Sequence, residues 1–415
     1  MRGFSVLSII LLFVCTILID WGVWSTIRKY ASKRKKLWSR IYSAVAVLSL
    51  ALVTAICCWR GDRSGDSLTL LMWMLYVYFT IYIPKFIYLL IAGIGWIFSK
   101  LGSNRKSKVG YFITIAGAII GVLVFIAMWV GTFYTRRHID VEKVELFSSK
   151  LPASFDGYKI VQFSDAHVGT WGNDTTFIAK LVKEINSLNP DLVVFTGDIV
   201  NRSTAELQPF ISTLSKIKAK DGVISVLGNH DYGDYMHWNS EEDHIANNQL
   251  LAQWEKDMGW DLLNNDYQYI TNGTDSIVII GVENWGEPPF HQYGELTESY
   301  LPTGNSTVDL NDGNYKILLS HNPEHWNREV TKISNINLTL AGHTHAMQTE
   351  VNLFGWKWSP AVFRYPLWGG LYARDPKDGE KAYLYVNIGC GEVGIPARFG
   401  VAYPELTEIT LRREK

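Results

Sequence analysis

Four long apolar runs, all before about residue 135 of a 415-residue chain, constrain the fold more than any other feature. Three of them hold roughly 19 or more residues each, enough for a helix to cross a hydrocarbon core of ~30 Å. The fourth, Leu68–Phe98, is longer and contains Pro84, so we expect one kinked or tilted helix, with a re-entrant hairpin as the alternative. We expect the first run to remain as an uncleaved helix. The three shorter runs are Phe4 to about Trp24, Ile41–Trp59 and Tyr111–Tyr134.

Lys and Arg are unevenly distributed among the loops between these runs. The first loop carries a dense basic cluster between Arg28 and Arg40, and the third loop is also basic. The second loop has only Arg60 and Arg63, offset by two aspartates. The positive-inside rule therefore predicts that loops one and three are cytoplasmic and that the C-terminal two-thirds lie outside the cytoplasm. An Arg-Arg pair just after the last run argues weakly for the opposite orientation.

After the last apolar run, short apolar stretches alternate with amphipathic ones. Strands that alternate with helices indicate a layered α/β domain, and we expect Lys381–Val386 and Leu406–Leu411 to complete a second sheet. We therefore predict an α/β fold class with an anchor of about four transmembrane helices (1–135), a linker (136–156) and a two-sheet α/β sandwich (157–415). The expected helices are Thr175–Leu188, Thr204–Lys218 and Glu241–Met258, and the earlier strands are Tyr158–Phe163, Leu192–Phe195, Val223–Leu227, Ile277–Ile280, Lys316–Leu319 and Leu338–Leu340.

Histidines, carboxylates and one asparagine follow the expected strands, where the functional groups of α/β sheets collect. A single histidine at a strand end is usually structural, but here several fall on ordered motifs. Their oxygen and nitrogen atoms suit two divalent ions, and Mn, Fe or Zn better than Ca or Mg. Two such ions clamp a phosphate and activate a bridging water, and they need a bridging carboxylate, for which Asp198 is the candidate. The expected metal ligands are Asp165, His167, Asp198, Asn229, His321, His343 and His345.

The motifs D-x-H, G-D, G-N-H-D, a lone H and G-H-x-H occur in this order over roughly residues 157–412. Together they resemble the calcineurin-like metallophosphoesterase superfamily. The run from Gly389 to Gly400, followed by Pro404-Glu405, is similar to the closing segment of membrane-associated bacterial phosphodiesterases. That resemblance implies a bacterial inner-membrane protein, and some of these relatives act on lipid-linked or nucleotide-sugar lipid substrates.

The resemblance also implies a role for each motif residue. His230 would be the general acid or a proton donor to the phosphate, and Asp231 would orient it. From the residues alone, the alternatives are that Asp231 only caps the following turn and that Asn229 is a turn residue. The two implied metal sites share one carboxylate: Asp165, His167, Asp198 and His345 form the first, and Asp198, Asn229, His321 and His343 form the second.

Two further features stay open on the sequence alone. The stretch Phe354–Tyr372 is dense in aromatic residues, which suits a membrane interface, an acyl-chain groove or a satellite core beneath a long loop. Arg398 could contact a substrate phosphate or form a structural salt bridge.

The leading hypothesis is a membrane-anchored hydrolase of a phosphodiester or phosphomonoester, which would act through a hydroxide held between two metals. The anchor favours a lipid-linked or envelope substrate, with the lipid bilayer as a partner. A protein or nucleotide phosphatase, or a non-enzymatic metal-binding membrane sensor, are the alternatives. A net charge of −1 argues against a nucleic-acid partner, and four cysteines, three of them in apolar runs, form neither a disulfide framework nor a thiolate zinc site.

Overall fold

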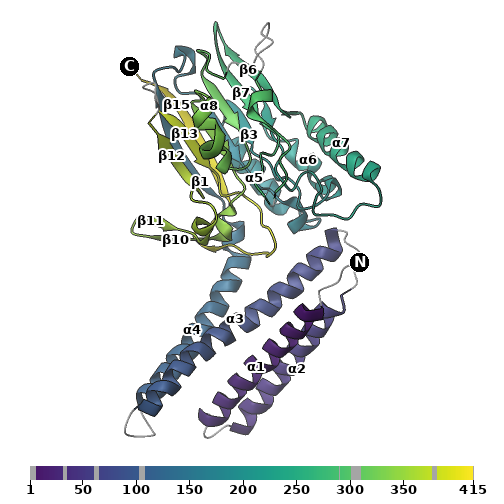
Figure 1. Ribbon diagram of the computed structural model, residues 1–415, viewed down its shortest axis with the longest axis vertical. Helices are drawn as coiled ribbons and strands as arrows, with labels where there is room; N and C mark the ends of the chain where they lie inside the picture. Colours follow the sequence, from purple (N-terminus) through teal and green to yellow (C-terminus); the bar gives the residue numbers. More distant parts are fainter. Residues whose placement is uncertain are drawn as a thin grey trace. The chain divides into compact units, whose positions relative to one another are not determined.

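A computed structural model of the chain describes residues 6–30, 35–59, 65–101, 108–288, 290–300, 310–375 and 381–414. The chain forms two compact units, shown in Figure 1. The helical unit comprises Met1–Phe133 with Gly394–Ala397, and the α/β unit comprises Tyr134–Val393 with Arg398–Lys415.

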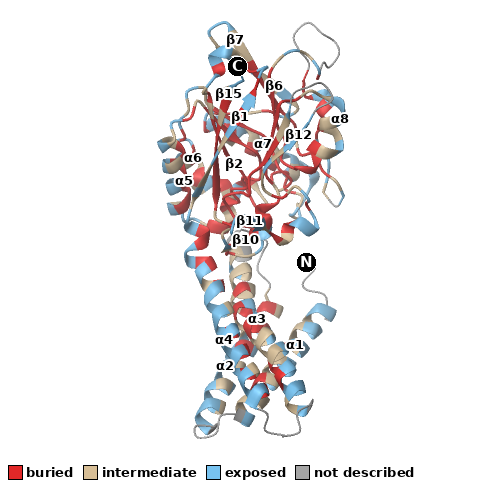
Figure 2. Ribbon diagram, turned by 90° about the vertical axis from the view of Figure 1, so that its left-hand side faces the viewer, coloured by how far each residue is buried: buried red, intermediate tan, exposed pale blue. Residues whose placement is uncertain are grey.

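Four helices make up the helical unit, and each is long and apolar enough to cross a membrane. Helix α3 runs unbroken through Pro84, so the re-entrant hairpin considered for this stretch is wrong. Exposed and half-buried positions cover much of their surface in Figure 2, as expected for helices whose apolar side chains face lipid. The helices are α1 (Val6–Tyr30), α2 (Lys35–Cys57), α3 (Gly65–Leu101) and α4 (Lys108–Phe133).

Small residues allow α3 and α4 to pack closely. A Cβ on Gly110 would collide with the backbone oxygen of Gly95, and one on Gly121 would lie 3.1 Å from the backbone oxygen of Pro84. Between helices in lipid, where the hydrophobic effect gives no attraction, such close approach increases van der Waals contact. Glycine at these positions therefore stabilises the helix pair.

An ion pair joins α1 to α3 within the helical unit. Lys85 Nζ lies 2.8 Å from Asp20 Oδ1, and the hydroxyls of Tyr42 and Tyr82 donate to the two Asp20 oxygens at 2.6 and 2.9 Å. A charged group in a membrane segment is costly unless it is paired and hydrogen-bonded. This pairing gives both charges a structural role.

Two six-stranded sheets form the core of the α/β unit, in the orders β1-β15-β2-β3-β4-β5 and β12-β13-β9-β8-β7-β6. The first sheet contains β1 (Asp140–Ser148), β2 (Lys159–Phe163), β3 (Leu192–Phe195), β4 (Val223–Ser225), β5 (Trp260–Leu262) and β15 (Glu405–Arg413). The second contains β6 (Asp266–Asn272), β7 (Asp275–Gly281), β8 (Lys316–Leu319), β9 (Leu338–Ala341), β12 (Gly370–Arg374) and β13 (Ala382–Val386). A small third sheet contains β10 (Thr349–Leu353), β11 (Trp356–Trp358) and β14 (Phe399–Gly400).

The two large sheets pack face to face, as the expected sandwich requires. Because successive side chains of a strand point to opposite faces, Ile160 of β2 packs between the sheets, whereas Val161 packs under helices α5 (Thr176–Ser187) and α7 (Glu241–Asp257). Strands buried on both faces in this way are nearly all apolar, which explains why β2, β3, β8 and β9 read as continuous apolar runs.

Two expected elements differ in the structure. The stretch Leu406–Leu411 does not complete the second sheet, because β15 lies in the first, parallel to β1 and antiparallel to β2. The stretch Thr204–Lys218 is not one helix but a 3₁₀ segment, η4 (Thr204–Phe210), followed by the single turn α6 (Ile211–Leu214). Pro209, which has no backbone N–H, interrupts the regular α-helical hydrogen bonding there.

The range 136–156, expected to be a linker, contains strand β1, which pairs along nine residues with β15. A strand of this length with a parallel partner is part of the sheet, so little of this range is a free connection. The proposed limits of the anchor at 135 and of the soluble domain at 157 remain predictions.

Candidate metal centre

The seven expected ligand residues all lie on loops that follow strands of the two large sheets. Strands β2, β3 and β4 run parallel in one sheet and β8 and β9 run parallel in the other, so the loops at their carboxyl ends gather at one edge of each sheet. Six of the seven are buried and one, His343, is half-buried. They are Asp165 and His167 after β2, Asp198 after β3, Asn229 after β4, His321 after β8, and His343 and His345 after β9.

The backbone is left-handed at five of these positions. The φ angles are 51° at Asp165, 40° at His167, 63° at Asp198, 75° at His343 and 50° at His345. A non-glycine residue held in this region costs about 1 kcal/mol or more, and such residues cluster where a site requires a particular side-chain direction. The concentration of left-handed residues here indicates that the loops are shaped for function rather than for stability.

Two motif glycines are required sterically. A Cβ on Gly228 would overlap the Asp198 carboxylate, and a Cβ on Gly342 would overlap the Asp165 carboxylate. The glycines of the G-N-H-D and G-H-x-H motifs therefore let two carboxylates approach the neighbouring backbone.

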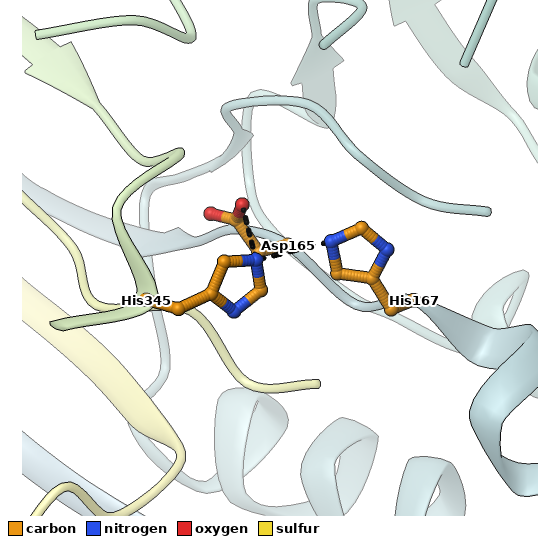
Figure 3. A group of neighbouring side chains, drawn as sticks. All are labelled: Asp165, His167 and His345. Carbon is orange, nitrogen blue, oxygen red and sulfur yellow. Dashed lines mark hydrogen bonds and ion pairs between the residues drawn. The ribbon is translucent and has the colours of Figure 1, made fainter. Parts of the chain in front are cut away.

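A first group of ligand atoms gathers around His345 (Figure 3). Its Nε2 lies 3.1 Å from Asp165 Oδ1 and 3.1 Å from His167 Nε2. Asp198 Oδ2 lies 3.6 Å from the same nitrogen of His167. Carboxylate oxygens and imidazole nitrogens that converge in this way form a set able to hold one divalent ion.

A second group gathers on the other side of Asp198. Its Oδ2 lies 3.1 Å from His321 Nε2, and that nitrogen lies 3.2 Å from His343 Nδ1. Asn229 Oδ1 is buried and has no hydrogen-bond partner within the described chain. A buried amide oxygen without a partner is costly, and a cation would satisfy it. The residues present therefore fit a second divalent ion.

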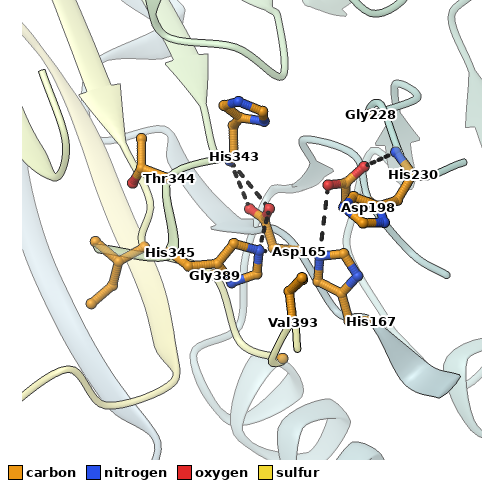
Figure 4. A network of polar contacts seen from close by, with 12 residues as sticks. Asp165, His167, Asp198, Gly228, His230, His343, Thr344, His345, Gly389 and Val393 are labelled. Atoms are coloured by element: carbon orange, nitrogen blue, oxygen red, sulfur yellow. Dashed lines mark hydrogen bonds and ion pairs between the residues drawn. The ribbon is translucent and has the colours of Figure 1, made fainter. Parts of the chain in front are cut away.

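One carboxylate oxygen belongs to both groups. Asp198 Oδ2 is near His167 in the first group and His321 in the second, at the two distances given above. Its other oxygen accepts the backbone N–H of His230 at 2.7 Å, drawn in Figure 4, which fixes the carboxylate. The arrangement places Asp198 where a bridge between two ions would have to be.

Backbone carbonyls orient two of the imidazole rings. His167 Nδ1 lies 3.1 Å from the Val200 carbonyl oxygen, and His321 Nδ1 lies 2.7 Å from the Thr196 carbonyl oxygen. When Nδ1–H donates to these carbonyls, the lone pair of each Nε2 points at the centre. Partners of this kind usually set the tautomer of a metal-binding histidine.

Burial and the neighbouring charges set the protonation of the centre. Burial, aided by the nearby His230 charge, holds the pKa of His167 well below its usual range, and burial with the His321 charge lowers that of His343 to about 3. Burial opposes ionisation of Asp198, but the charges of His321 and His230 outweigh it and keep the pKa of this carboxyl well below normal. Burial also opposes a charge on His321, yet Asp198 raises its pKa to about 9. Ionised carboxylates and mostly neutral imidazoles are the forms that bind metal.

Comparison with known proteins matches a family model to a part of each unit. The calcineurin-like phosphoesterase family matches residues 158–347, and a probable calcineurin-like phosphoesterase transmembrane domain matches residues 2–136. The uncharacterized metallophosphoesterase YkuE of Bacillus subtilis is 30% identical over 294 residues, which are 68% of this chain and 90% of that protein. The chain belongs to the calcineurin-like phosphoesterase family.

Two other relatives extend this comparison. A transmembrane protein with metallophosphoesterase domain from Danio rerio is 26% identical over 317 residues, which cover 75% of this chain and 64% of that protein. The UDP-2,3-diacylglucosamine pyrophosphatase LpxG of Chlamydia muridarum is 32% identical over 126 residues, which cover 29% of this chain and 38% of that protein. The chain is thus a multi-pass membrane metallophosphoesterase, of a family that uses divalent metals.

In this phosphoesterase, Asp231 does not orient His230 as expected. The Asp231 carboxylate accepts backbone N–H groups instead, from Asp198 at 2.7 Å, Ile199 at 2.9 Å and Gly228 at 2.9 Å. His230 Nδ1 lies 2.7 Å from the carbonyl oxygen of Asn201, which orients the ring. Asp231 therefore holds the loop that carries the central carboxylate, through hydrogen bonds from backbone N–H groups to its side chain that a sequence motif does not reveal.

Arg398 takes neither of the roles considered for it. The side chain is fully buried, and its Nη2 donates to the carbonyl oxygens of Gly391, Gly389 and Ile388 at 2.6, 2.9 and 3.1 Å. The same segment is tied to the metal centre, because the N–H of Gly391 donates to the Asp165 carbonyl oxygen at 2.7 Å. Arg398 thus fixes the loop against which Asp165 rests.

Sequence reasoning missed two residues beside the phosphoesterase centre. The Tyr365 hydroxyl lies 3.0 Å from His343 Nε2, and the Asn229 amide donates to the Tyr235 hydroxyl at 2.8 Å. Tyr365 lies in the aromatic stretch that follows the last motif, where no signal separates it from six neighbouring aromatics. Tyr235 follows the G-N-H-D motif by four residues, so its proximity along the chain was the one available clue.

Proposed function

We propose that this phosphoesterase hydrolyses a phosphodiester or phosphomonoester of a lipid or envelope component, at a centre of two divalent ions. The observation that carries the two-ion centre is the position of Asp198 Oδ2, near ligand atoms of both groups. Asp165, His167 and His345 would complete one ion site. Asn229, His321 and His343 would complete the other. Two bound ions would supply hydroxide at neutral pH and stabilise charge on the phosphoryl oxygens.

A residue of the chain, His230, would donate a proton to the leaving group. His230 lies beside the first group, its ring 4.8 Å from that of His167, and Asn201 occupies its Nδ1. That leaves Nε2 to donate a proton. Burial lowers the pKa of His230, but the negative charge of a bound phosphoester would favour the protonated ring.

The choice of a lipid or envelope substrate rests on two supports. The chain has four helices able to cross a membrane, and part of it resembles an enzyme named for a diacylated sugar nucleotide. We also propose that the protein resides in a bacterial cell membrane with the α/β unit on the extracytoplasmic side, as the basic first and third loops favour. Protease treatment of intact cells tests this placement, because an external α/β unit would be digested.

Replacing the shared carboxylate tests the centre. We expect Asp198→Asn in the full chain to lower hydrolysis of an aryl phosphodiester with Mn by about a thousandfold or more, since metal ions stabilise the transition state by several kcal/mol. Bound metal, measured by elemental analysis, should fall as well. Asp261→Asn, which changes an exposed carboxylate of β5, is the matched control and should change neither quantity.

A substrate screen then separates the alternatives. Metal-loaded full-length protein is offered phospholipids, sugar-nucleotide lipids, nucleotides and a phosphopeptide. Turnover of a lipid phosphoester supports the proposal, whereas turnover of the phosphopeptide or nucleotides alone would favour a soluble substrate. If wild-type protein with metal bound turns over no phosphoester at all, the hydrolase assignment fails.

A further inference from the structure

The α/β unit exposes a compact group of large apolar side chains, which we call the aromatic patch: Leu353, Phe354, Trp356, Val362 and Phe363. Phe354 is fully exposed, and Phe363 and Trp356 expose 84% and 61% of their surface. Among the described residues of this unit, these three are the most exposed large apolar side chains. Contiguous apolar surface of this kind usually marks a contact with another apolar phase.

The patch is built from two elements that follow each other in the chain. Strands β10 and β11 form a hairpin with Leu353 opposite Trp356, and Phe354 lies at its tip. The 3₁₀ turn η8 (Pro360–Phe363) follows directly, and the Phe363 ring packs edge-on against the ring of Trp358 at 6.3 Å. The patch is therefore held in place by the fold and does not depend on a loose loop.

The residues at the tip of this hairpin are not those that such a turn favours. Phe354 and Gly355 have φ angles of 54° and 88°, so both turn residues are left-handed. A two-residue turn of this kind favours Asn-Gly or Asp-Gly, because a bulky side chain is strained at positive φ. A phenylalanine with a strained backbone and a fully exposed side chain does not stabilise the fold. This indicates that Phe354 serves an interaction outside the α/β unit.

The patch lies near the residues at which the chain enters the α/β unit. Lys357 of the hairpin forms a 2.9 Å ion pair with Glu142, the third residue of strand β1. Helix α4, the last able to span a membrane, ends at Phe133, and β1 begins at Asp140. A connection this short spans at most about 25 Å. The β6–β7 turn lies at the opposite end of the unit (Figures 1 and 2).

We propose that the aromatic patch is a membrane-docking surface, whose occupant is the interfacial layer of the bilayer that holds the helical unit. Aromatic side chains favour this layer, and the chain is tethered to it within reach of the patch. Arg364, which is exposed and follows Phe363 in the chain, would face lipid phosphates. Docking would orient the α/β unit toward the bilayer, whatever the substrate. The patch ends at Phe363, two residues before Tyr365 at the metal centre.

Site-specific quenching in the full chain tests this proposal. An environment-sensitive fluorescent amino acid is placed at position 354, 363 or 274, and the protein is reconstituted in phospholipid nanodiscs. Thr274 is the matched control because it is exposed in the β6–β7 turn. Labels at 354 and 363 should be quenched severalfold more by spin-labelled lipid than the label at 274, and should be shielded from aqueous iodide.

Each other result overturns the proposal. Iodide access at 354 and 363 equal to that at 274 would show that the patch faces water. Shielding from both lipid and iodide would show that protein, such as a second copy of the chain, covers it. Phe354→Asn provides a folded comparison, because Asn-Gly suits the turn. That variant should retain or raise the thermal midpoint in detergent while it reduces lipid quenching at 363, a combination that misfolding would not give.

Discussion

The hydroxyl oxygen of Tyr365 lies 3.0 Å from Nε2 of His343, while Nδ1 of the same ring lies 3.2 Å from Nε2 of His321, the nitrogen that also contacts the shared carboxylate of Asp198. The hydroxyl thus engages the nitrogen that does not face the centre. An N–H on Nε2 that donates to Tyr365 leaves the Nδ1 lone pair for a metal. Phe290 packs edge-on against the same ring at 4.9 Å, which further restricts its orientation.

Removal of this hydroxyl should weaken metal binding. We expect Tyr365→Phe to lower affinity for one of two Mn ions by about 10- to 100-fold, as is typical when the hydrogen-bond partner of a ligand histidine is lost. Metal titration followed by calorimetry measures the effect, and Tyr372→Phe, which removes a hydroxyl that binds the Gly369 N–H, is the control. Equal affinities for the wild type and Tyr365→Phe would show that the hydroxyl does not tune His343.

His230 should matter for the leaving group rather than for metal content. We expect His230→Gln to retain both metals and to lower kcat by about 10²–10⁴-fold for an alkyl phosphoester, since a proton donor contributes about that much. An activated aryl ester, whose leaving group needs no proton, should lose far less. Parallel assays of the two esters measure the difference.

The matched control for this experiment is His237→Gln, because His237 is exposed. His230 also lies in a group with His167 and Asp198 that could hold an ion. Loss of one bound metal from His230→Gln, with equal losses on both esters, would make His230 a ligand and would contradict the proton-donor role.

The ligand residues could be predicted from the sequence because each follows a short apolar strand. Strand type and strand end are local properties, and parallel strands bring their carboxyl ends to the same edge without further information. The four membrane helices were predictable for the same reason, since length and hydropathy decide them.

The features that could not be predicted from the sequence depend on contacts between distant segments. The apolar run of β15 does not reveal whether it joins β2 or β13, because both sheets offer similar apolar faces. The role of Asp231 depends on backbone N–H groups 31 to 33 residues earlier in the chain, and that of Tyr365 on the course of an irregular segment. Such pairings are set by the packed fold and leave no periodic pattern in the sequence.

A buried carboxyl away from the centre should give a pH-dependent stability. Glu255 of α7 is fully buried, its Oε2 accepts the Ser225 hydroxyl, and burial raises its pKa to about 8. In the unfolded chain the Glu255 carboxyl loses its proton near pH 4.5, whereas in the folded chain it keeps the proton up to about pH 8. The folded state therefore binds more protons in this window, so the contribution of Glu255 to stability falls as the pH rises through it.

Glu255→Gln should remove that dependence. We expect the variant to gain stability relative to wild type between about pH 5 and 8, by an amount on the order of a few kcal/mol, because one pKa unit corresponds to about 1.4 kcal/mol. Thermal midpoints across this range measure the gain, and Glu298→Gln at an exposed position is the control. A constant offset between variant and wild type at all pH values would contradict the assignment.

Arg398 should be required for the fold around Asp165 rather than for substrate binding. Its planar guanidinium reaches three carbonyl oxygens at once, and the ammonium of a lysine cannot match that geometry. We expect Arg398→Lys to lower the free energy of unfolding by about 3 kcal/mol, since buried carbonyls lose their donors, and to weaken metal binding through the displaced Asp165. Arg412→Lys, at an exposed ion pair with Glu145, is the control and should leave the thermal midpoint nearly unchanged, because exposed ion pairs contribute little to stability. If Arg398→Lys instead raised KM while the thermal midpoint stayed unchanged, Arg398 would be a substrate contact.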